Sequence, residues 1–451
     1  MRRQSILSGA SIVAIFLVLM TGGHAIAEKG GISFWTTEIE PKRMKIQQAL
    51  SKRFEQATGV SVEVVPVKES QLAIRIVAAA AAGALPDTVF VPLDFIINWA
   101  EEGILDSNAA TTVIDELAEA SFASGPLRMA RVKEGWAAVP ADGWGQLLLY
   151  RKDLFVAQGI DTMLGAPDSW EKILKATKAL HKPPNMWGMA VGTDPGQVYT
   201  QQVFEQFALS NGARLLNTTT GKVDLNTPEF IQTLKFYKEL AAYSPPGDIY
   251  WRQTREDYLG GRMAMIIWSP FILDELAGLR DSVPVTAQGL KRSLHEMTGI
   301  VTAFQGPMGS KPAQWGQVSY FGITTGADPE ALNWVQFLLG EGYLDWLSMA
   351  PEGKVPLRHQ FVDGWKNLEI GVDRKTKISE LYPDAVIDSM IAGADRFDRW
   401  AFAQGKGACV GQLYGTKTLI RILRRYLDGD MSAEHAAEQM TVEIGKLSAC
   451  P

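Results

Sequence analysis

Alternating strand and helix patterns fill the first fifth of the chain. Residues 31–36 predict a short strand, and Pro41 begins a helix in which Leu50 and Phe54 share one apolar face until Gly59 ends it. The alternation continues with three further elements: a β-branched strand at 60–67, an alanine-rich helix at 70–84 and a strand at 88–91. Strands that alternate with helices predict right-handed crossovers and a mostly parallel sheet, with ligands bound at the carboxyl ends of its strands.

The stretch from Tyr258 to Pro270 predicts a second set of strands. A helix that begins near Thr254 ends at a glycine pair, because glycine adopts the left-handed conformation that closes a helix. The apolar run that follows is typical of a buried strand, and Pro270 ends it. This places Trp268 at the tip of a core strand, where open α/β sheets form a ligand crevice.

The rest of the chain predicts more helices than strands. Amphipathic spacing or capping residues predict helices at 170–180, 195–211, 228–243, 329–339 and 416–427, with a further strand at 315–324. A chain of 451 residues, 46% hydrophobic and 21% charged, is too long for one typical core and favours two lobes. We find no repeat, low-complexity tract or flexible linker.

Several motifs carry a resemblance to a known family. They are Phe34-Trp35, the helix end and strand start at 54–60, the Leu-Pro-Asp-Thr-Val run at 85–89, the Ala-Val-Pro to Asp-Leu-Phe stretch at 138–155, the Gly-Arg-Met-Ala-Met block before Trp268, and Gly-Lys-Val-Pro-Leu-Arg at 353–358. Together they resemble the extracellular solute-binding proteins of carbohydrate ABC transporters, the maltose-binding-protein-like family. The resemblance covers nearly the whole chain after residue 27.

The resemblance implies an α/β fold of two lobes, each a mostly parallel sheet flanked by helices, joined by a hinge. It implies an N-terminal lobe formed by residues 28–142 and 298–345, and a C-terminal lobe formed by 143–297 and 346–451. The chain would first cross between the lobes near Gly143 and Gly145, because glycines supply backbone freedom at a pivot.

The same resemblance implies a ligand site between the lobes. The first lobe and the crossing would contribute Trp35, Glu38, Glu69, Asp94, Asp142 and Trp144, and the remaining contacts would be Tyr199, Trp268, Trp315 and Arg358. Sugars present flat C–H faces and a rim of hydroxyls, so aromatic rings, carboxylates and arginine suit them. The alternatives are core tryptophans, carboxylates that cap helices and an exposed arginine. The expected ligand is a sugar, a small oligosaccharide or a polyol-glycoside.

Catalytic motifs are absent from the sequence. It has no Gly-x-Ser-x-Gly and no His-Glu-x-x-His, and its histidines are scattered singly. We therefore expect a binding protein without cofactor or metal. The alternative is a secreted carbohydrate-active enzyme, a glycoside hydrolase or lyase, since paired carboxylates beside aromatics also describe those sites. A pure interaction protein would not need interior aromatics.

Residues 1–27 have the pattern of a secretory signal peptide. Arg2 and Arg3 precede an apolar segment, and Ala25-Ile26-Ala27 offers a cleavage site with no cysteine nearby for a lipid anchor. We expect a soluble, monomeric periplasmic protein that delivers its ligand to the permease subunits of an ABC transporter. The formal net charge of −6 argues against a nucleic-acid partner.

The two cysteines, Cys409 and Cys450, both lie near the C-terminus. An oxidising compartment favours a disulfide that ties the tail to the last domain, and two unpaired buried thiols are the alternative.

Overall fold

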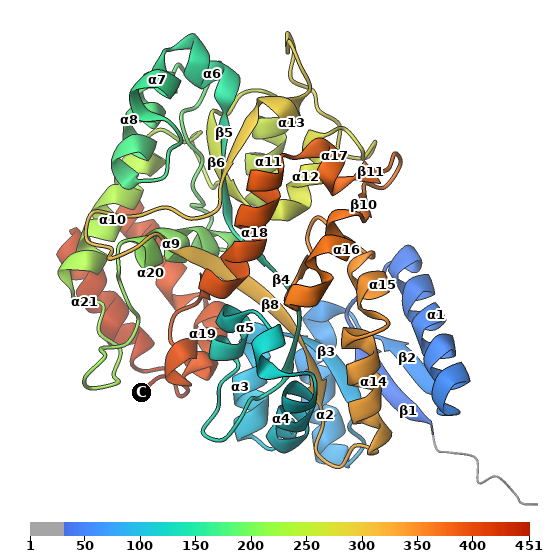
Figure 1. The fold of residues 1–451 in the computed structure, drawn as a ribbon. Coiled ribbons are helices and arrows are strands. Elements are labelled where there is room, and N and C mark those ends of the chain that lie inside the picture. The colour runs from blue at the N-terminus through green and yellow to red at the C-terminus, as the bar shows by residue number, and fades with distance from the viewer. Residues whose placement is uncertain (1–30) are drawn as a thin grey trace, which may run out of the picture.

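The computed structural model describes residues 31–451, so the predicted signal peptide at 1–27 lies outside the described residues. Two sheets occupy different halves of the molecule, with β1–β3 in the lower half of Figure 1 and β5 and β6 in the upper half. The predicted two-lobed α/β fold is confirmed, and we call the two halves the N-terminal and C-terminal lobes. Within 31–451 every helix is too short or too polar to cross a membrane.

The larger sheet forms the centre of the N-terminal lobe. Its strand order is β2-β1-β3-β8-β4-β9, and β12 also pairs with β8. The strands are β1 (Ile32–Thr36), β2 (Val62–Pro66), β3 (Thr88–Pro92), β4 (Val139–Gly145), β8 (Gln314–Ile323), β9 (Val355–Pro356) and β12 (Phe397–Asp398). The first three run parallel, as their helical crossovers predict, whereas β8 pairs antiparallel with both β3 and β4.

The smaller sheet forms the centre of the C-terminal lobe, and here the prediction of parallel strands is wrong. Its order is β6-β5-β7, with β5 (Leu147–Arg151) pairing antiparallel to both β6 (Met265–Trp268) and β7 (Thr298–Val301). The reason is the path of the chain. It leaves the larger sheet through β4 into β5 and returns through β7 into β8, so the outgoing and returning segments run side by side in opposite directions.

Helices flank both sheets (Figure 1). Those used below are α1 (Pro41–Thr58), α2 (Glu69–Ala82), α3 (Leu93–Glu101), α4 (Ser107–Glu116), α8 (Trp170–Leu180), α9 (Val198–Ser210), α10 (Pro228–Ala241), α11 (Trp251–Leu259), α12 (Leu273–Leu276), α14 (Glu330–Leu339), α18 (Asp384–Arg396), α19 (Gly407–Thr416), α20 (Thr418–Asp428) and α21 (Ala433–Ile444). A small hairpin, β10 (Glu369–Ile370) and β11 (Thr376–Lys377), lies between the last two strands of the larger sheet in sequence.

Helix α1 shows how local sequence sets an element's ends. Pro41 occupies the first helical turn, where its missing N–H costs nothing, and Gly59 closes the helix with a φ of 75°. Leu50 and Phe54 are buried on the face that packs against the core. All three features agree with the prediction made from the sequence.

The predicted lobe boundaries stay a prediction, because strand pairing does not show to which lobe the residues outside the two sheets belong. Three strands lie across those boundaries. Strand β7 pairs in the smaller sheet although 298 was expected to open a return to the first lobe, and β9 and β12 pair in the larger sheet although 346–451 was expected in the second.

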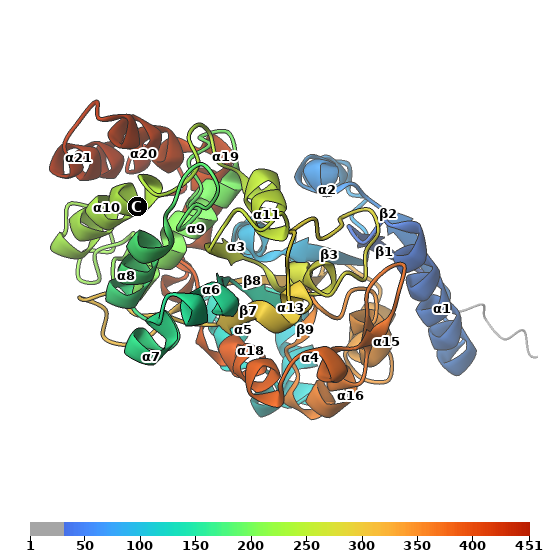
Figure 2. The same ribbon diagram turned by 90° about the horizontal axis from the view of Figure 1, so that it is seen from above.

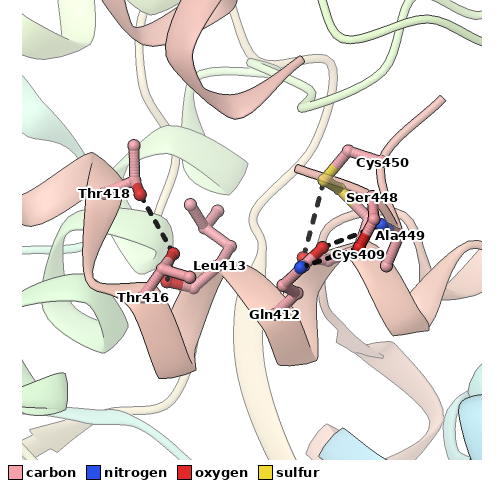
Figure 3. The surroundings of a disulfide bond; sticks show 8 residues. All are labelled: Cys409, Gln412, Leu413, Thr416, Thr418, Ser448, Ala449 and Cys450. Carbon is pink, nitrogen blue, oxygen red and sulfur yellow. Dashed lines mark hydrogen bonds between the residues drawn. A yellow bond between two sulfur atoms is a disulfide. The ribbon is translucent and has the colours of Figure 1, made fainter. Parts of the chain in front are cut away.

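The C-terminal helices connect the lobes on the side away from α1 (Figure 2). Helix α19 packs against α3 of the N-terminal lobe, while α20 and α21 pack on each other and on α10. Cys409 in α19 forms a disulfide with Cys450 beyond α21, which confirms the predicted pair. Figure 3 shows Gln412 beside it, donating to Ser448 Oγ at 3.0 Å and accepting from the Ala449 N–H at 2.8 Å.

Candidate functional site

A cavity of about 280 Å³ lies where β4, β6, α9 and α11 meet. We call it the aromatic pocket, because four of its lining residues are aromatic. Its lining residues are Trp144, Gln146, Gln197, Val198, Tyr199, Gln202, Trp251, Trp268 and Ser269. Three of the predicted ligand contacts, Trp144, Tyr199 and Trp268, are therefore brought together in one opening.

The pocket's rings come from elements far apart in sequence. Trp268 is the last residue of β6, and its Cα partner in β5 is Leu147, directly after the chain has crossed from β4. The Trp268 ring lies 5.6 Å from that of Tyr199 and 6.4 Å from that of Trp251, centroid to centroid. Such tilted rings present both faces and edges, which suits a ligand with a flat apolar side.

Polar groups complete the aromatic pocket. Gln146 is 4% exposed, and its Oε1 has no hydrogen-bond partner among residues 31–451. Gln197 and Gln202 lie at the start of α9, whose first backbone N–H groups are not capped by the Gln197 side chain. Gln197 and Gln202 are partly exposed, and an amide offers both donors and an acceptor, so these two side chains can bind hydroxyls in either sense.

The glycines of the crossing are required by close packing. Neither Gly143 nor Gly145 has a positive φ. A Cβ on Gly145 would lie 2.2 Å from the Gln314 side chain and 2.6 Å from the Phe397 ring, and one on Gly143 would lie 2.9 Å from the Gln317 carbonyl oxygen. Glycine is thus required at positions 143 and 145 because a larger side chain would clash, and not because the backbone there needs a conformation that only glycine adopts.

Glu38 and Asp142 share one buried lysine. Lys354, 2% exposed, lies 2.6 Å from Glu38 and 3.0 Å from Asp142. Burial would raise the pKa of Glu38, but the charges of Lys354 and Arg43 outweigh it and hold the pKa at about 2. Desolvation dominates at Asp142 and raises its pKa, although Lys354 and the Trp346 N–H stabilise its charge. Both carboxylates are thus engaged by the protein itself.

Asp94 and Glu69 lie at the starts of α3 and α2. Asp94 accepts from Arg399 at 3.0 Å and from Gln317 at 3.2 Å. The Glu69 side chain makes no hydrogen bond or ion pair with any described residue. Desolvation and the charges of Asp94 and Glu38 raise its pKa. Of the predicted carboxylates, Glu69 is the one whose oxygens are free for a ligand.

Two of the predicted aromatic contacts, Trp35 and Trp315, also lie outside the aromatic pocket. Trp35 is partly buried on β1 and packs against the core. Trp315 is fully buried, with its ring 5.4 Å from that of Trp144 and the Arg399 guanidinium 4.5 Å from its centroid on another side. It can support Trp144 but has no surface for a ligand.

The prediction that Arg358 reaches the ligand does not agree with its contacts. Arg358 is 3% exposed and donates to the carbonyl oxygens of Leu339 and Leu117 and to Ser121 Oγ, at 2.7, 3.0 and 3.0 Å. It therefore joins the carboxyl ends of α14 and α4, where free carbonyls favour a cation. The alternative of an exposed arginine is equally wrong.

Sequence reasoning missed several residues of the site. Gln146, Gln197, Gln202 and Ser269 line the aromatic pocket, and each lies within three residues of a residue that was predicted. Trp251, the first residue of α11, also lines the pocket. The sequence around Arg399 does not indicate its role, because its partners Asp94, Glu205 and Gln317 all lie far from it in the chain.

Residues 31–451 contain no group of three or more His, Cys, Asp or Glu side chains arranged to hold a metal ion.

Comparison with known proteins identifies a family. The family model for bacterial extracellular solute-binding proteins matches residues 49–361. A putative ABC transporter periplasmic-binding protein of Escherichia coli K12, YcjN, is 29% identical over 350 residues, which is 75% of this chain and 76% of that protein.

Solved structures share the fold. Maltose-bound MalE3 of T. maritima has a TM-score of 0.68 at 20% identity, with 92% of this chain and 99% of that chain covered. The cyclic alpha-maltosyl-1,6-maltose binding protein of Arthrobacter globiformis has a TM-score of 0.72 at 14% identity, with 92% and 98% covered. At these identities the likeness concerns the fold alone.

Proposed function

Because the chain belongs to the bacterial extracellular solute-binding protein family, we propose that it binds a sugar, a small oligosaccharide or a polyol-glycoside between its lobes. It then delivers this ligand, as a monomer in the periplasm, to the permease subunits of an ABC transporter. The observation that carries the ligand class is the aromatic pocket, in which four aromatic residues and three glutamines surround one cavity.

The chemistry of that pocket supports a neutral, hydroxyl-rich ligand. Indole and phenol faces cover the C–H side of a sugar ring, and side-chain amides exchange hydrogen bonds with its hydroxyls. The nearby cation Arg399 is fully buried and already contacts Asp94 and Glu205, so it offers no free charge to an acidic ligand. Several fold relatives are described with bound saccharides, among them maltose and laminaribiose, which supports the same class.

The proposed binding mechanism follows from the fact that residues of both lobes line the aromatic pocket. Trp144 lies near the end of strand β4 in the larger sheet, whereas Tyr199, Trp251 and Trp268 belong to the lobe of the smaller sheet. A ligand that contacts both lobes stabilises the arrangement in which they are close, by as much as its contacts differ between open and closed forms. We propose that the closed form is the one the permease recognises.

A catalytic role is disfavoured by the state of the carboxylates. Glu38, with a pKa of about 2, cannot serve as a general acid, and Asp142 and Asp94 are bound to Lys354 and Arg399. Among the predicted site carboxylates, Glu69 alone has a raised pKa and a free carboxyl, and a single such group does not make the pair of carboxylates that most glycoside hydrolases use.

A thermal-shift screen of the mature protein against a carbohydrate and polyol panel tests the proposal. A ligand that binds only the folded protein stabilises it by about 2.7 kcal/mol at one hundred times its Kd, which raises the Tm measurably. Incubation of each hit with the protein, followed by chromatography, checks that the sugar is returned unchanged. Absence of any shift across the panel, or turnover of a hit, would reject the proposal.

A further inference from the structure

Trp251 lines the aromatic pocket without a hydrogen bond from its own side chain. It is the first residue of α11, so no preceding helical turn packs against its ring. The ring is only partly buried, and its indole N–H donates to no group among the described residues. By contrast, the Tyr199 hydroxyl donates to the Ile267 carbonyl oxygen at 3.0 Å, and Trp268 belongs to a buried strand. Other contacts must therefore fix the orientation of Trp251.

Two guanidinium groups lie over the Trp251 ring. The Arg252 group is 5.3 Å from the ring centroid and the Arg255 group is 5.4 Å from it. Such cation–π contacts are attractive within about 6 Å and become stronger when water is excluded. Arg252 is exposed, whereas Arg255 is partly buried and lies one helical turn from Trp251, on the same face of α11. Arg255 is thus the cation better placed to hold the ring.

Arg255 is itself held by a buried carboxylate. Its Nη1 donates to Glu275 Oε1 at 3.0 Å, and the Glu275 side chain is 5% exposed. Glu275 belongs to α12, which lies beside α11 in Figure 1 and follows closely after Trp268 and Ser269 in the chain. The ion pair therefore connects the segment of Trp268 to the helix of Trp251, and the rings of these two tryptophans are 6.4 Å apart.

The geometry of this ion pair shows that Arg255 is not placed for Glu275 alone. Arg255 Nε and Glu275 Oε2 are both buried and have no hydrogen-bond partner among the described residues, although the two side chains touch. A bidentate pair, the arrangement that arginine and a carboxylate favour, would satisfy both atoms. The guanidinium instead makes one hydrogen bond to Glu275 and lies over the Trp251 ring.

We propose that Arg255 is a positioning residue for the aromatic pocket: anchored by Glu275, its guanidinium fixes the orientation of the Trp251 ring and so keeps that wall of the ligand site in place. Arg255 does not line the cavity, so its effect on affinity passes through Trp251. The inference rests on the proposed function for the ligand, whereas the orientation of the ring can be measured without one.

The first test observes the ring directly. The protein is labelled with 5-fluorotryptophan, and the fluorine NMR resonance of Trp251 is assigned by its loss in Trp251→Phe. Burial raises the pKa of Glu275 to about 7, so spectra are recorded at about pH 8, where Glu275 is ionised. We expect Arg255→Met to shift or broaden the Trp251 resonance. Arg262→Met is the matched control, because Arg262 follows the same helix and pairs with Asp257 but lies over no ring of the pocket.

The second test measures affinity by calorimetric titration with maltose, laminaribiose and sorbitol. We expect Arg255→Met to weaken binding about three- to tenfold and Arg262→Met to leave it unchanged. In a Trp251→Ala background the Arg255→Met substitution should cost about twofold at most, because the ring through which it acts is gone.

Circular dichroism establishes that each variant is folded. If Arg255→Met does not fold, the double variant Arg255→Met, Glu275→Gln takes its place in both measurements, because it leaves no uncompensated carboxylate in the interior.

The inference is overturned if the Trp251 resonance is the same in the wild type and the Arg255 variant, or if Arg262→Met changes it equally. An affinity loss of the same size in the Trp251→Ala background also overturns it, because Arg255 would then act through another residue. If no probe binds the wild type, the proposed function loses its support, while the fluorine spectrum still decides whether Arg255 positions Trp251.

Discussion

At the residue scale, Lys354 shows how a buried charge joins distant parts of the chain. It lies between Glu38, just before α1, and Asp142 in β4, and is 2% exposed. Removing one partner of a buried ionic group leaves uncompensated charge, which costs far more than the loss of a surface pair.

Replacement of Lys354 by methionine is therefore expected to lower the free energy of unfolding by about 3–5 kcal/mol. The measurement is urea denaturation at neutral pH. Lys366→Met is the matched control, because its pair with Asp388 lies on the surface, and its cost should stay below about 1 kcal/mol. Equal losses in the two variants would contradict this account of the Lys354 cluster.

Trp268 is the residue on which ligand affinity should depend most within the aromatic pocket. Its ring lies next to those of Tyr199 and Trp251, so truncation removes the centre of the aromatic surface. We expect Trp268→Ala to weaken binding of the ligand found by screening by about 2 kcal/mol or more, roughly thirtyfold in Kd by calorimetry. Trp187→Ala, a partly buried tryptophan outside the cavity, should bind normally.

At the element scale, α19 and the C-terminal tail form one unit. Helix α19 packs against α3, and the disulfide fastens it to the segment after α21, closing a loop of 41 residues (Figure 3). Because α20 and α21 pack with α10, this loop connects the N-terminal lobe to helices of the other lobe.

A Cys409→Ala, Cys450→Ala double variant should lose about 4 kcal/mol of stability, the chain-entropy value for a loop of 41 residues. Chemical denaturation of the oxidised wild type and the variant measures it. Added reductant should change nothing in the variant. A variant as stable as the wild type would mean that the tail is held by packing alone.

At the scale of the whole molecule, three buried glutamates with shifted pKa values make stability depend on pH. Glu38 has a lowered pKa of about 2, so its contribution is present above pH 4.5 and is lost as the pH falls toward 2. Glu275 and Glu352 have pKa values raised to about 7 by burial, so each favours the folded state when protonated and destabilises it increasingly as the pH rises from 4.5 through 7.

Unfolding free energy should therefore decline on both sides of a maximum near pH 4.5, the unfolded pKa of these glutamates. Glu275→Gln should flatten the neutral side and gain up to about 3 kcal/mol at pH 8 relative to the wild type, since each pKa unit is worth about 1.4 kcal/mol. Denaturation curves between pH 3 and 8 measure this. A parallel decline in the variant would show that other groups cause it.

The sequence by itself determined the features that depend on neighbours in the chain. Pro41 and Gly59 set the ends of α1, and the apolar run before Pro270 marked β6. The family motifs led to the two-lobed fold and to Trp144, Tyr199 and Trp268, which share one pocket. The cysteine pair followed from their number and the expected compartment. Each of these rests on local backbone preference or on a short motif.

Only the tertiary structure decided the direction of the smaller sheet and the surroundings of individual polar side chains. Arg358 binds the ends of α14 and α4, Trp315 lies behind Trp144, and Lys354 lies between Glu38 and Asp142. The physical reason is that burial and pairing depend on atoms contributed by distant segments. A sequence pattern indicates which polar and aromatic side chains are present, whereas the contacts in the folded protein determine which of them remain free for a ligand.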